Sequence, residues 1–313
     1  MVDALLAVHP NARPAARVTA PDPDTVGAIY LESGGPVTPG DDTRAVGTPV
    51  VVTDGSRGWD VGMAWGLEGL ARRFGGETVR CNDRAPARHA DELGPAGAQR
   101  SCAVPLGEFV EYAASRPRCD DPAGLAAADA PFYCNGWRAF SDLSGGGSGE
   151  VAAAFPPPHF AQAVDHSLDI VRQTHRALLP DQPPAAADAI AASVDASLSK
   201  VFAGPAGTVT RLHQDAGDAH AWLGQAAGRK LFVCYPPDDS PHLYPIPGET
   251  ETVQSAVDPL SPRSDTAPPA WDPTSEQRPL YWARARPVVF VLEAGEVVLV
   301  PRGWWHYAAV GLG

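Results

Sequence analysis

Two histidines and one aspartate have the residue types and spacing of a metal-binding set. His213 and Asp215 stand two positions apart at the end of a predicted strand, and His306 follows much later in the chain. Side chains two apart on a strand share a face, and a neighbouring strand could carry the third ligand. Such a facial set is typical of non-haem Fe(II) oxygenases, because the other octahedral positions stay open for a chelating cosubstrate and O2. We therefore predict that His213, Asp215 and His306 bind one catalytic metal ion.

The His–x–Asp spacing alone does not identify a site, since the chain carries it twice. His89-Ala90-Asp91 has the same spacing, but it lies in a polar stretch without strand patterning, and we interpret it as solvated surface. The turn-like residues Asp215–Asp218 leave a surface turn open as the alternative interpretation of the second pair.

The surroundings of the second pair favour the metal interpretation. Thr210 lies shortly before His213, and Lys230 directly precedes the apolar run Leu231–Tyr235. A lysine leading into a buried strand is costly unless an anion pairs with it, and a dicarboxylate cosubstrate would supply that anion. Arg229 is the alternative partner for the anion. The segment before His306, PRGWW, ends a strand in a tight turn, although its tryptophans also suit an ordinary core.

The elements that must position these residues are short strands and amphipathic helices. Apolar and β-branched runs predict strands at Pro49–Thr53 and Leu231–Tyr235, and Val288–Leu292 and Glu296–Val300 predict a hairpin that turns at Glu293–Gly295. Helical periodicity, bounded by glycine or proline, predicts helices over Trp65–Phe74, Leu106–Ala114, Phe160–Leu179 and Ala185–Leu198.

The domain organisation that follows has two parts. Residues 1–48, rich in Pro, Asp, Gly and Ala, predict an N-terminal arm that wraps a core, and residues 49–313 predict one domain with a helical insert at about 155–198. The polar excursion Asp238–Arg286, with Trp271, Tyr281 and Trp282, suits either a lid over a site or a passive connection.

Composition excludes several classes of protein. The chain has 313 residues and a net charge of −13, which argues against a nucleic-acid partner because phosphate backbones would be repelled. It has no apolar run long enough to span a membrane and no secretory signal pattern, so we expect no membrane partner. Its five cysteines are dispersed without metal-type spacing, which favours reduced thiols and an intracellular location, cytoplasm or nucleus.

The ordered motifs resemble the JmjC/cupin-like 2-oxoglutarate hydroxylase family. The resemblance rests on Thr210-x-x-His213-x-Asp215, Gly228-Arg229-Lys230, Tyr235-Pro236-Pro237, Gly295-Glu296-Val297 and Pro301-Arg302-Gly303-Trp304-Trp305-His306. Pro49-Val50-Val51, Trp65–Phe74, Phe132-Tyr133 and Trp137 resemble the first half of the same domain. The similarity covers roughly residues 49–310.

The resemblance implies an α+β fold whose core is a double-stranded β-helix, the cupin or jelly-roll arrangement, with flanking helices. Fe(II) would be held by His213, Asp215 and His306. The distal carboxylate of the cosubstrate 2-oxoglutarate would pair with Lys230 and hydrogen-bond to Thr210, and Tyr133 would contact the same molecule. The implied activity is hydroxylation of a protein side chain, with demethylation where the oxidised carbon is an N-methyl group.

The sequence also departs from the family. Some members carry an asparagine where this chain has Trp222-Leu223, and members continue into a further core strand, whereas this sequence stops at Gly313. Two other functions stay open: a catalytically silent cupin scaffold, and a cupin that uses Zn or Mn on a small molecule. Substrate contacts are predicted for Tyr133 and Trp137, which equally suit an aromatic core, while Trp222, His220 and Asp218 better suit a surface loop. A protein or peptide substrate is favoured, with a small molecule as the alternative.

Overall fold

The computed structural model describes most of the chain. The described residues are 6, 11–19, 22, 25, 47–60, 65–83, 101–116, 131–164, 167–215, 220–246, 253–255, 257–260 and 284–311. Several residues of the sequence analysis lie outside them: His89, Asp91, Asp218, Trp271, Tyr281 and Trp282.

The largest sheet has seven strands, and its central strands are buried on both faces. Apolar residues of β10 alternate, so that Leu231 and Val233 pack on one face while Phe232 and Cys234 pack on the other. Neighbouring strands are antiparallel except for β1 and β13. The order is β1 (Arg13–Pro14), β13 (Val288–Glu293), β10 (Arg229–Tyr235), β15 (Trp305–Val310), β8 (Val209–Gln214), β12 (Val253–Ser255) and β11 (Pro245–Ile246).

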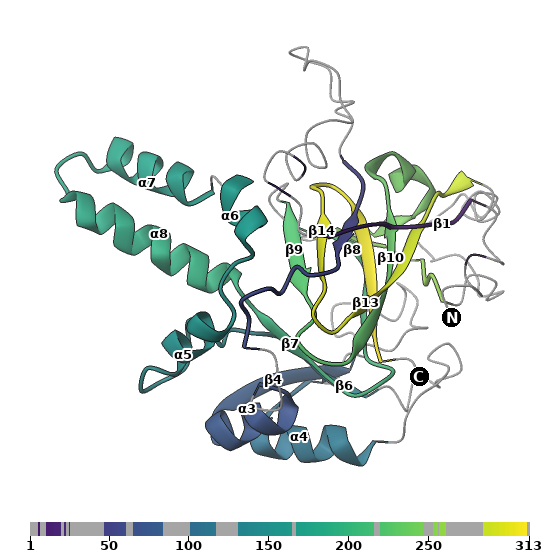
Figure 1. Ribbon diagram of the computed structural model, residues 1–313, viewed down its shortest axis with the longest axis horizontal. Coiled ribbons are helices and arrows are strands. Elements are labelled where there is room, and N and C mark those ends of the chain that lie inside the picture. The colour runs from purple at the N-terminus through teal and green to yellow at the C-terminus, as the bar shows by residue number, and fades with distance from the viewer. Residues whose placement is uncertain are drawn as a thin grey trace, which may run out of the picture.

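A second sheet of four strands packs against one face of the first, as Figure 1 shows. Its order is β2 (Ala16–Val18), β3 (Val50–Val52), β14 (Val297–Val300) and β9 (Ala221–Gly224). Phe232 and Phe290 of the large sheet stack at a centroid distance of 5.2 Å and meet Val298 of the small sheet in the space between them. These two sheets form the jelly-roll core, which confirms the predicted fold class. The N-terminal segment contributes β1 to one sheet and β2 to the other.

The predicted hairpin at Glu293–Gly295 is wrong. The turn exists, with Gly295 at φ +93°, but β13 pairs with β10 and β1 in the large sheet, whereas β14 pairs with β3 and β9 in the small one. The chain therefore crosses between sheets at this turn. Both strands are apolar on both faces, so each finds a separate pair of neighbours.

A third sheet lies beside the jelly roll and packs on helices through one of its faces (Figure 1). Leu70, Leu106 and Phe109 of these helices meet the buried thiols of the sheet in one apolar cluster. The strand order is β5 (Ser101–Pro105), β4 (Thr78–Asp83), β6 (Phe132–Trp137) and β7 (Val201–Ala203), and the helices are α3 (Leu67–Phe74), α4 (Leu106–Ser115) and α5 (Gly147–Ala154).

The helical insert consists of α6 (His159–Val164), α7 (Ser167–Leu178) and α8 (Pro184–Leu198). The fully buried Phe160 of α6 packs on Val52 and Leu299 of the small sheet. Helices α7 and α8 run alongside each other and project from the body (Figure 1). A short 3₁₀ helix, Pro237–His242, follows β10. Within the described residues, no helix is both long and apolar enough to cross a bilayer.

Candidate metal centre

An irregularity in β8 gives this strand its functional face. His213 lies opposite His306 of β15, and Thr210 lies opposite Ala308, so the two residues between them on β8 face a single residue of β15. In a regular strand Thr210 and His213 would point to opposite faces, but one extra residue in the strand brings them to the same face. The bulge thus explains the threonine–histidine spacing in the sequence.

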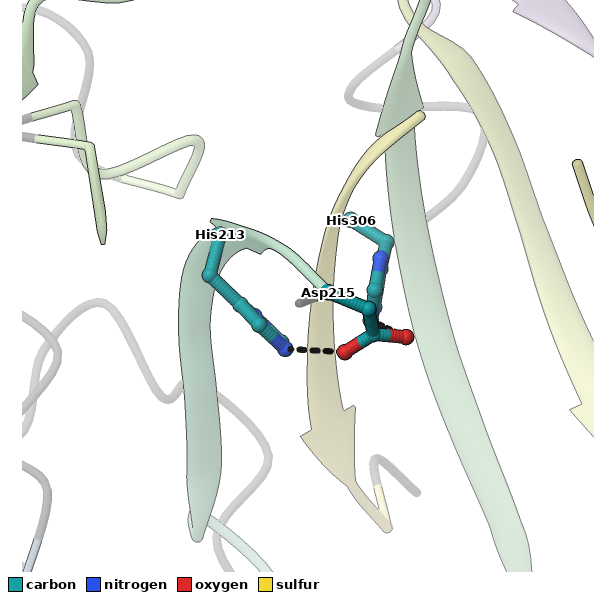
Figure 2. Close-up of side chains that lie close together, drawn as sticks. All are labelled: His213, Asp215 and His306. Carbon is teal, nitrogen blue, oxygen red and sulfur yellow. Dashed lines mark ion pairs between the residues drawn. The ribbon is translucent and has the colours of Figure 1, made fainter. Parts of the chain in front are cut away.

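The side chains of His213, Asp215 and His306 converge at one end of this face. One ligand atom from each lies within 4.8 Å of the other two. The Nε2 atom of His213 is 3.4 Å from Asp215 Oδ1, and the Nε2 atom of His306 is 3.8 Å from Asp215 Oδ2. Figure 2 shows His213 on β8, His306 on β15, and the carboxylate of Asp215 just beyond the end of β8. Ligand atoms around an octahedral cation are about 3 Å apart, so these separations are close to those that a bound ion would need.

Backbone carbonyls orient both imidazoles. The Nδ1 atom of His213 is 2.7 Å from the carbonyl oxygen of Arg211, and the Nδ1 atom of His306 is 3.3 Å from that of Trp304. A carbonyl only accepts, so each Nδ1 carries a hydrogen, and loss of the Nε2 proton would leave that nitrogen with a lone pair for a metal ion on the side of Asp215. Histidines that bind a metal usually donate their second ring N–H to a carbonyl or carboxylate in this way. The donor set therefore fits a divalent transition metal.

Burial and mutual charge set the protonation of the cluster. Burial, with the His213 ring adding to it, lowers the pKa of His306 to about 4. Burial also opposes ionisation of Asp215, but the hydrogen bond from His213 and the charges of His306, His213 and Lys200 outweigh it and lower the pKa of Asp215 to about 2. At neutral pH His306 is therefore neutral and Asp215 is ionised, which are the forms that bind metal.

Lys230 lies at the other end of the same sheet face. Along β10 and β15 the pairs are Cys234 with His306, Phe232 with Ala308 and Lys230 with Val310. Lys230 is thus four residues along from the histidine, about 13 Å at the rise of a strand. Arg229 shares the opposite face with Leu231, so the geometry favours Lys230 over Arg229 as the residue that faces the interior.

The third sheet surrounds the lysine with aromatic groups. Lys230 Nζ donates a hydrogen bond to Tyr133 Oη at 3.1 Å, and it lies 5.6 Å from the Tyr133 ring centre and 5.5 Å from that of Phe202. Tyr133 is 1% exposed. Within the part of the chain that the structure describes, Lys230 forms no ion pair. This half-buried ammonium group is therefore available to an anionic ligand.

The other candidate residues lie in the apolar core, on the outer face of the small sheet, or beside the turn before His306. Trp137 belongs to the apolar cluster beneath α3, because a shift in strand register around Gly136 (φ +87°) turns it to the face opposite Tyr133. Leu223 packs between the two jelly-roll sheets and Trp222 on the outer face of the small sheet. The backbone N–H of Arg302 donates to His220 Nδ1, next to the turn before His306.

Sequence reasoning missed one residue at each end of this sheet face. Phe202 is a half-exposed ring above Lys230, and the exposed Lys200 is close enough to influence the charge of Asp215. One signal was present in the sequence: Lys200 and Lys230 are its only lysines. Lys200 acts on Asp215 at the metal end of the sheet face, and Lys230 lies at its other end.

Comparison with known proteins identifies the domain. The family model for the cupin-like domain matches residues 40–310. HSPB1-associated protein 1 of Rattus norvegicus is 32% identical over 111 residues, covering 35% of this chain and 20% of the relative. The 2-oxoglutarate and iron-dependent oxygenase JMJD4 of Gallus gallus is 33% identical over 106 residues, 34% of this chain and 22% of the relative.

Lysine-specific demethylase 8 of Xenopus tropicalis is 32% identical over 116 residues, which are 37% of this chain and 23% of that protein. The matched segments thus span only about a fifth of the length of these relatives. The match to the domain, in contrast, extends over most of the chain and confirms the resemblance inferred from the ordered motifs. The protein belongs to the cupin-like domain family.

Proposed function

We propose that this protein is an Fe(II)- and 2-oxoglutarate-dependent oxygenase that hydroxylates a protein side chain. The observation that carries the proposal is the shared sheet face, with His213, Asp215 and His306 at one end and Lys230 at the other. A metal site alone would suit many reactions. The ammonium group on the same face adds the requirement for an anion that reaches towards the metal, which 2-oxoglutarate meets.

The relatives support this cofactor assignment. One is named as a 2-oxoglutarate and iron-dependent oxygenase, and another as a lysine-specific demethylase. Two imidazoles with one carboxylate are also the set that leaves a facial triangle of positions open on iron. A site for Zn or Mn acting on a small molecule would not need Lys230.

The residues have distinct tasks in the proposed reaction. Bound Fe(II) with 2-oxoglutarate would supply the oxidising power, by decarboxylation of the cosubstrate with O2. His213, Asp215 and His306 hold the metal, and Lys230 with Thr210 holds the distal carboxylate of the cosubstrate. Tyr133 keeps the lysine ammonium group in place through its hydroxyl. The apolar residues Phe232 and Ala308 line the face between these ends and exclude water from it.

Substrate would approach from the side of Asp215. The Asp215 side chain is 40% exposed, whereas those of His213 and His306 are 12% and 7% exposed. The name of the lysine-specific demethylase among the relatives supports a protein side chain as the group that enters here. Where the oxidised carbon is an N-methyl group, the same hydroxylation releases the methyl group, so hydroxylation and demethylation are outcomes of one chemistry.

Anaerobic spectroscopy and cosubstrate turnover test the proposal. Fe(II) and 2-oxoglutarate together should give a weak visible charge-transfer band, and His213→Ala should abolish it. The matched control is His159→Ala, an exposed histidine on α6 that should leave the band unchanged. In air, the same mixture should form succinate slowly, and faster with a suitable peptide. Absence of both band and succinate from the folded protein would contradict the proposal and favour a silent scaffold.

A further inference from the structure

Three cysteines form a row across the third sheet. Cys81 of β4 lies directly opposite Cys102 of β5 on one side and directly opposite Cys134 of β6 on the other. All three side chains join the apolar cluster beneath α3 and α4, so they share one face of the sheet. Cys81 interacts with both neighbours through its thiol, and all three are free thiols.

The register places both neighbours of Cys81 at disulfide distance. Directly opposed residues on antiparallel strands have Cα atoms about 4.5 or 5.5 Å apart, depending on whether they exchange hydrogen bonds. Disulfides span Cα separations of about 4.4–6.8 Å. The N–H and C=O of Cys81 point to one neighbouring strand, so one of its pairs is the narrow kind and the other the wide kind. Either bond therefore fits the backbone as it stands.

Burial gives the row a direction. Cys102 is partly exposed at one end, Cys81 is 1% exposed in the middle, and Cys134 is fully buried at the other end. A small oxidant in solution would meet Cys102 first. Cys234 provides a contrast, because it is buried in the jelly-roll interior, on a strand of another sheet.

We propose that this row of thiols is a reversible oxidation site that responds to a hydroperoxide. The Cys102 sulfur attacks one peroxide oxygen, the O–O bond breaks, and Cys102 becomes a sulfenic acid while water (or an alcohol) leaves. The Cys81 sulfur then attacks the sulfenic sulfur, the S–O bond breaks and a second water leaves. The product is a Cys81–Cys102 disulfide, so two thiols have lost two electrons and two protons to the peroxide.

Cys134 assists the second step. Its hydrogen bond to Cys81 lowers the pKa of the Cys81 thiol, which increases the thiolate available to attack the sulfenic acid.

Burial and the nearby Cys81 raise the pKa of Cys102, so the first step should become faster as the pH rises. Oxidation joins β4 to β5 and leaves Cys134 as a thiol.

Peroxide treatment of the metal-free full-length protein tests the site independently of the oxygenase proposal. The protein would carry Cys119→Ser, because Cys119 is a further thiol outside the row and the jelly-roll strand, and its oxidation would complicate the mapping. After hydrogen peroxide treatment at pH 8, alkylation in denaturant and peptide mass mapping should find Cys81 joined to Cys102. Dithiothreitol should restore both thiols. A predominant disulfide without Cys81, or a Cys81 that stays fully alkylatable, would overturn the proposal.

Three further variants define the role of each thiol. In Cys81→Ala, Cys102 should stop at the sulfenic acid, which dimedone traps. In Cys134→Ala, the Cys81–Cys102 disulfide should still form, but more slowly. Cys234→Ala is the matched control for loss of a buried thiol and should oxidise as the parent does. Equal rates in Cys134→Ala and Cys234→Ala would refute the assisting role of Cys134. The disulfide mapping in the Cys119→Ser parent stands even if one of these variants fails to fold.

Discussion

The two ends of the interior sheet face are built in different ways. At the metal end, His213 and His306 belong to adjacent strands of one sheet, and carbonyls of their own strands or the preceding turn orient both rings. At the lysine end, Lys230 comes from the large sheet, while Tyr133 and Phe202 come from the third sheet. One end depends on strand register, and the other depends on how two sheets meet.

This difference has consequences for how each end tolerates change. The metal end is stabilised by local geometry that β8 and β15 impose together. The lysine end holds an ammonium group between two rings without a carboxylate partner among the described residues, so its full stabilisation requires a ligand. Substitutions at the lysine end should therefore change cosubstrate affinity more than they change metal binding.

The largest effect is expected from Lys230→Met, which keeps the length of the side chain and removes its charge. Loss of one partner from a buried charge pair costs about 2–5 kcal/mol, so the dissociation constant of 2-oxoglutarate should rise at least about 30-fold. Titration of the anaerobic charge-transfer band measures it, while binding of the metal alone should change little.

Arg229→Met is the matched control for this substitution. Arg229 is the neighbouring cation on β10 but shares the opposite face with Leu231, so its loss should leave cosubstrate affinity within about twofold. A larger effect of Arg229→Met than of Lys230→Met would show that the anion binds on the face of β10 that carries Arg229. It would refute the description of this end.

A smaller effect concerns acid stability at the metal end. The pKa of His306 is about 4 in the folded protein against 6.5 ordinarily, chiefly because of burial. Between these values the unfolded chain binds a proton that the folded protein does not, so stability falls as the pH decreases. The expected loss is about 2 kcal/mol between pH 7 and pH 5. Asp215, with a pKa of about 2, adds its own loss only below about pH 4.

Urea unfolding with a chelator present, followed by tryptophan fluorescence, measures this dependence. His306→Asn removes the titrating group and should flatten the decline between pH 7 and 5, whereas His159→Asn on the exposed surface should not. Parallel declines in His306→Asn and wild type would show that burial of His306 does not cause the loss of stability in acid.

The jelly-roll class and the convergence of three distant side chains could be predicted from the sequence. The order of the motifs and the pattern of apolar residues in the strands can both be read without a structure. The hairpin at Glu293–Gly295 was wrong because turn residues define a reversal of direction and do not define which strands pair afterwards. Periodicity also predicted one helix over Phe160–Leu179, where the structure records α6 and α7 on either side of residues 165–166.

The lysine end was harder to predict than the metal end. Phe202 follows the helical insert, and no local pattern links it to β10. Trp137 was a substrate candidate with an aromatic core as the equal alternative, and the register shift near Gly136 places it in the core. Bulges reverse the face of a side chain without a reliable signal in the sequence.

The smallest effect is expected from Tyr133→Phe, which keeps the ring beside Lys230 and removes only the hydroxyl. The ammonium group loses one neutral acceptor at 3.1 Å but keeps both aromatic faces, so 2-oxoglutarate affinity should fall about 3- to 10-fold. Tyr112→Phe is the control, because this hydroxyl accepts only from the backbone of Phe132 among the recorded bonds. The titration used for Lys230→Met measures both.

In the background of Lys230→Met, Tyr133→Phe should add almost nothing, since the hydroxyl acts through the ammonium group. Additive losses in the double variant would instead place Tyr133 in direct contact with the cosubstrate, and the lysine end would then be built by two independent groups.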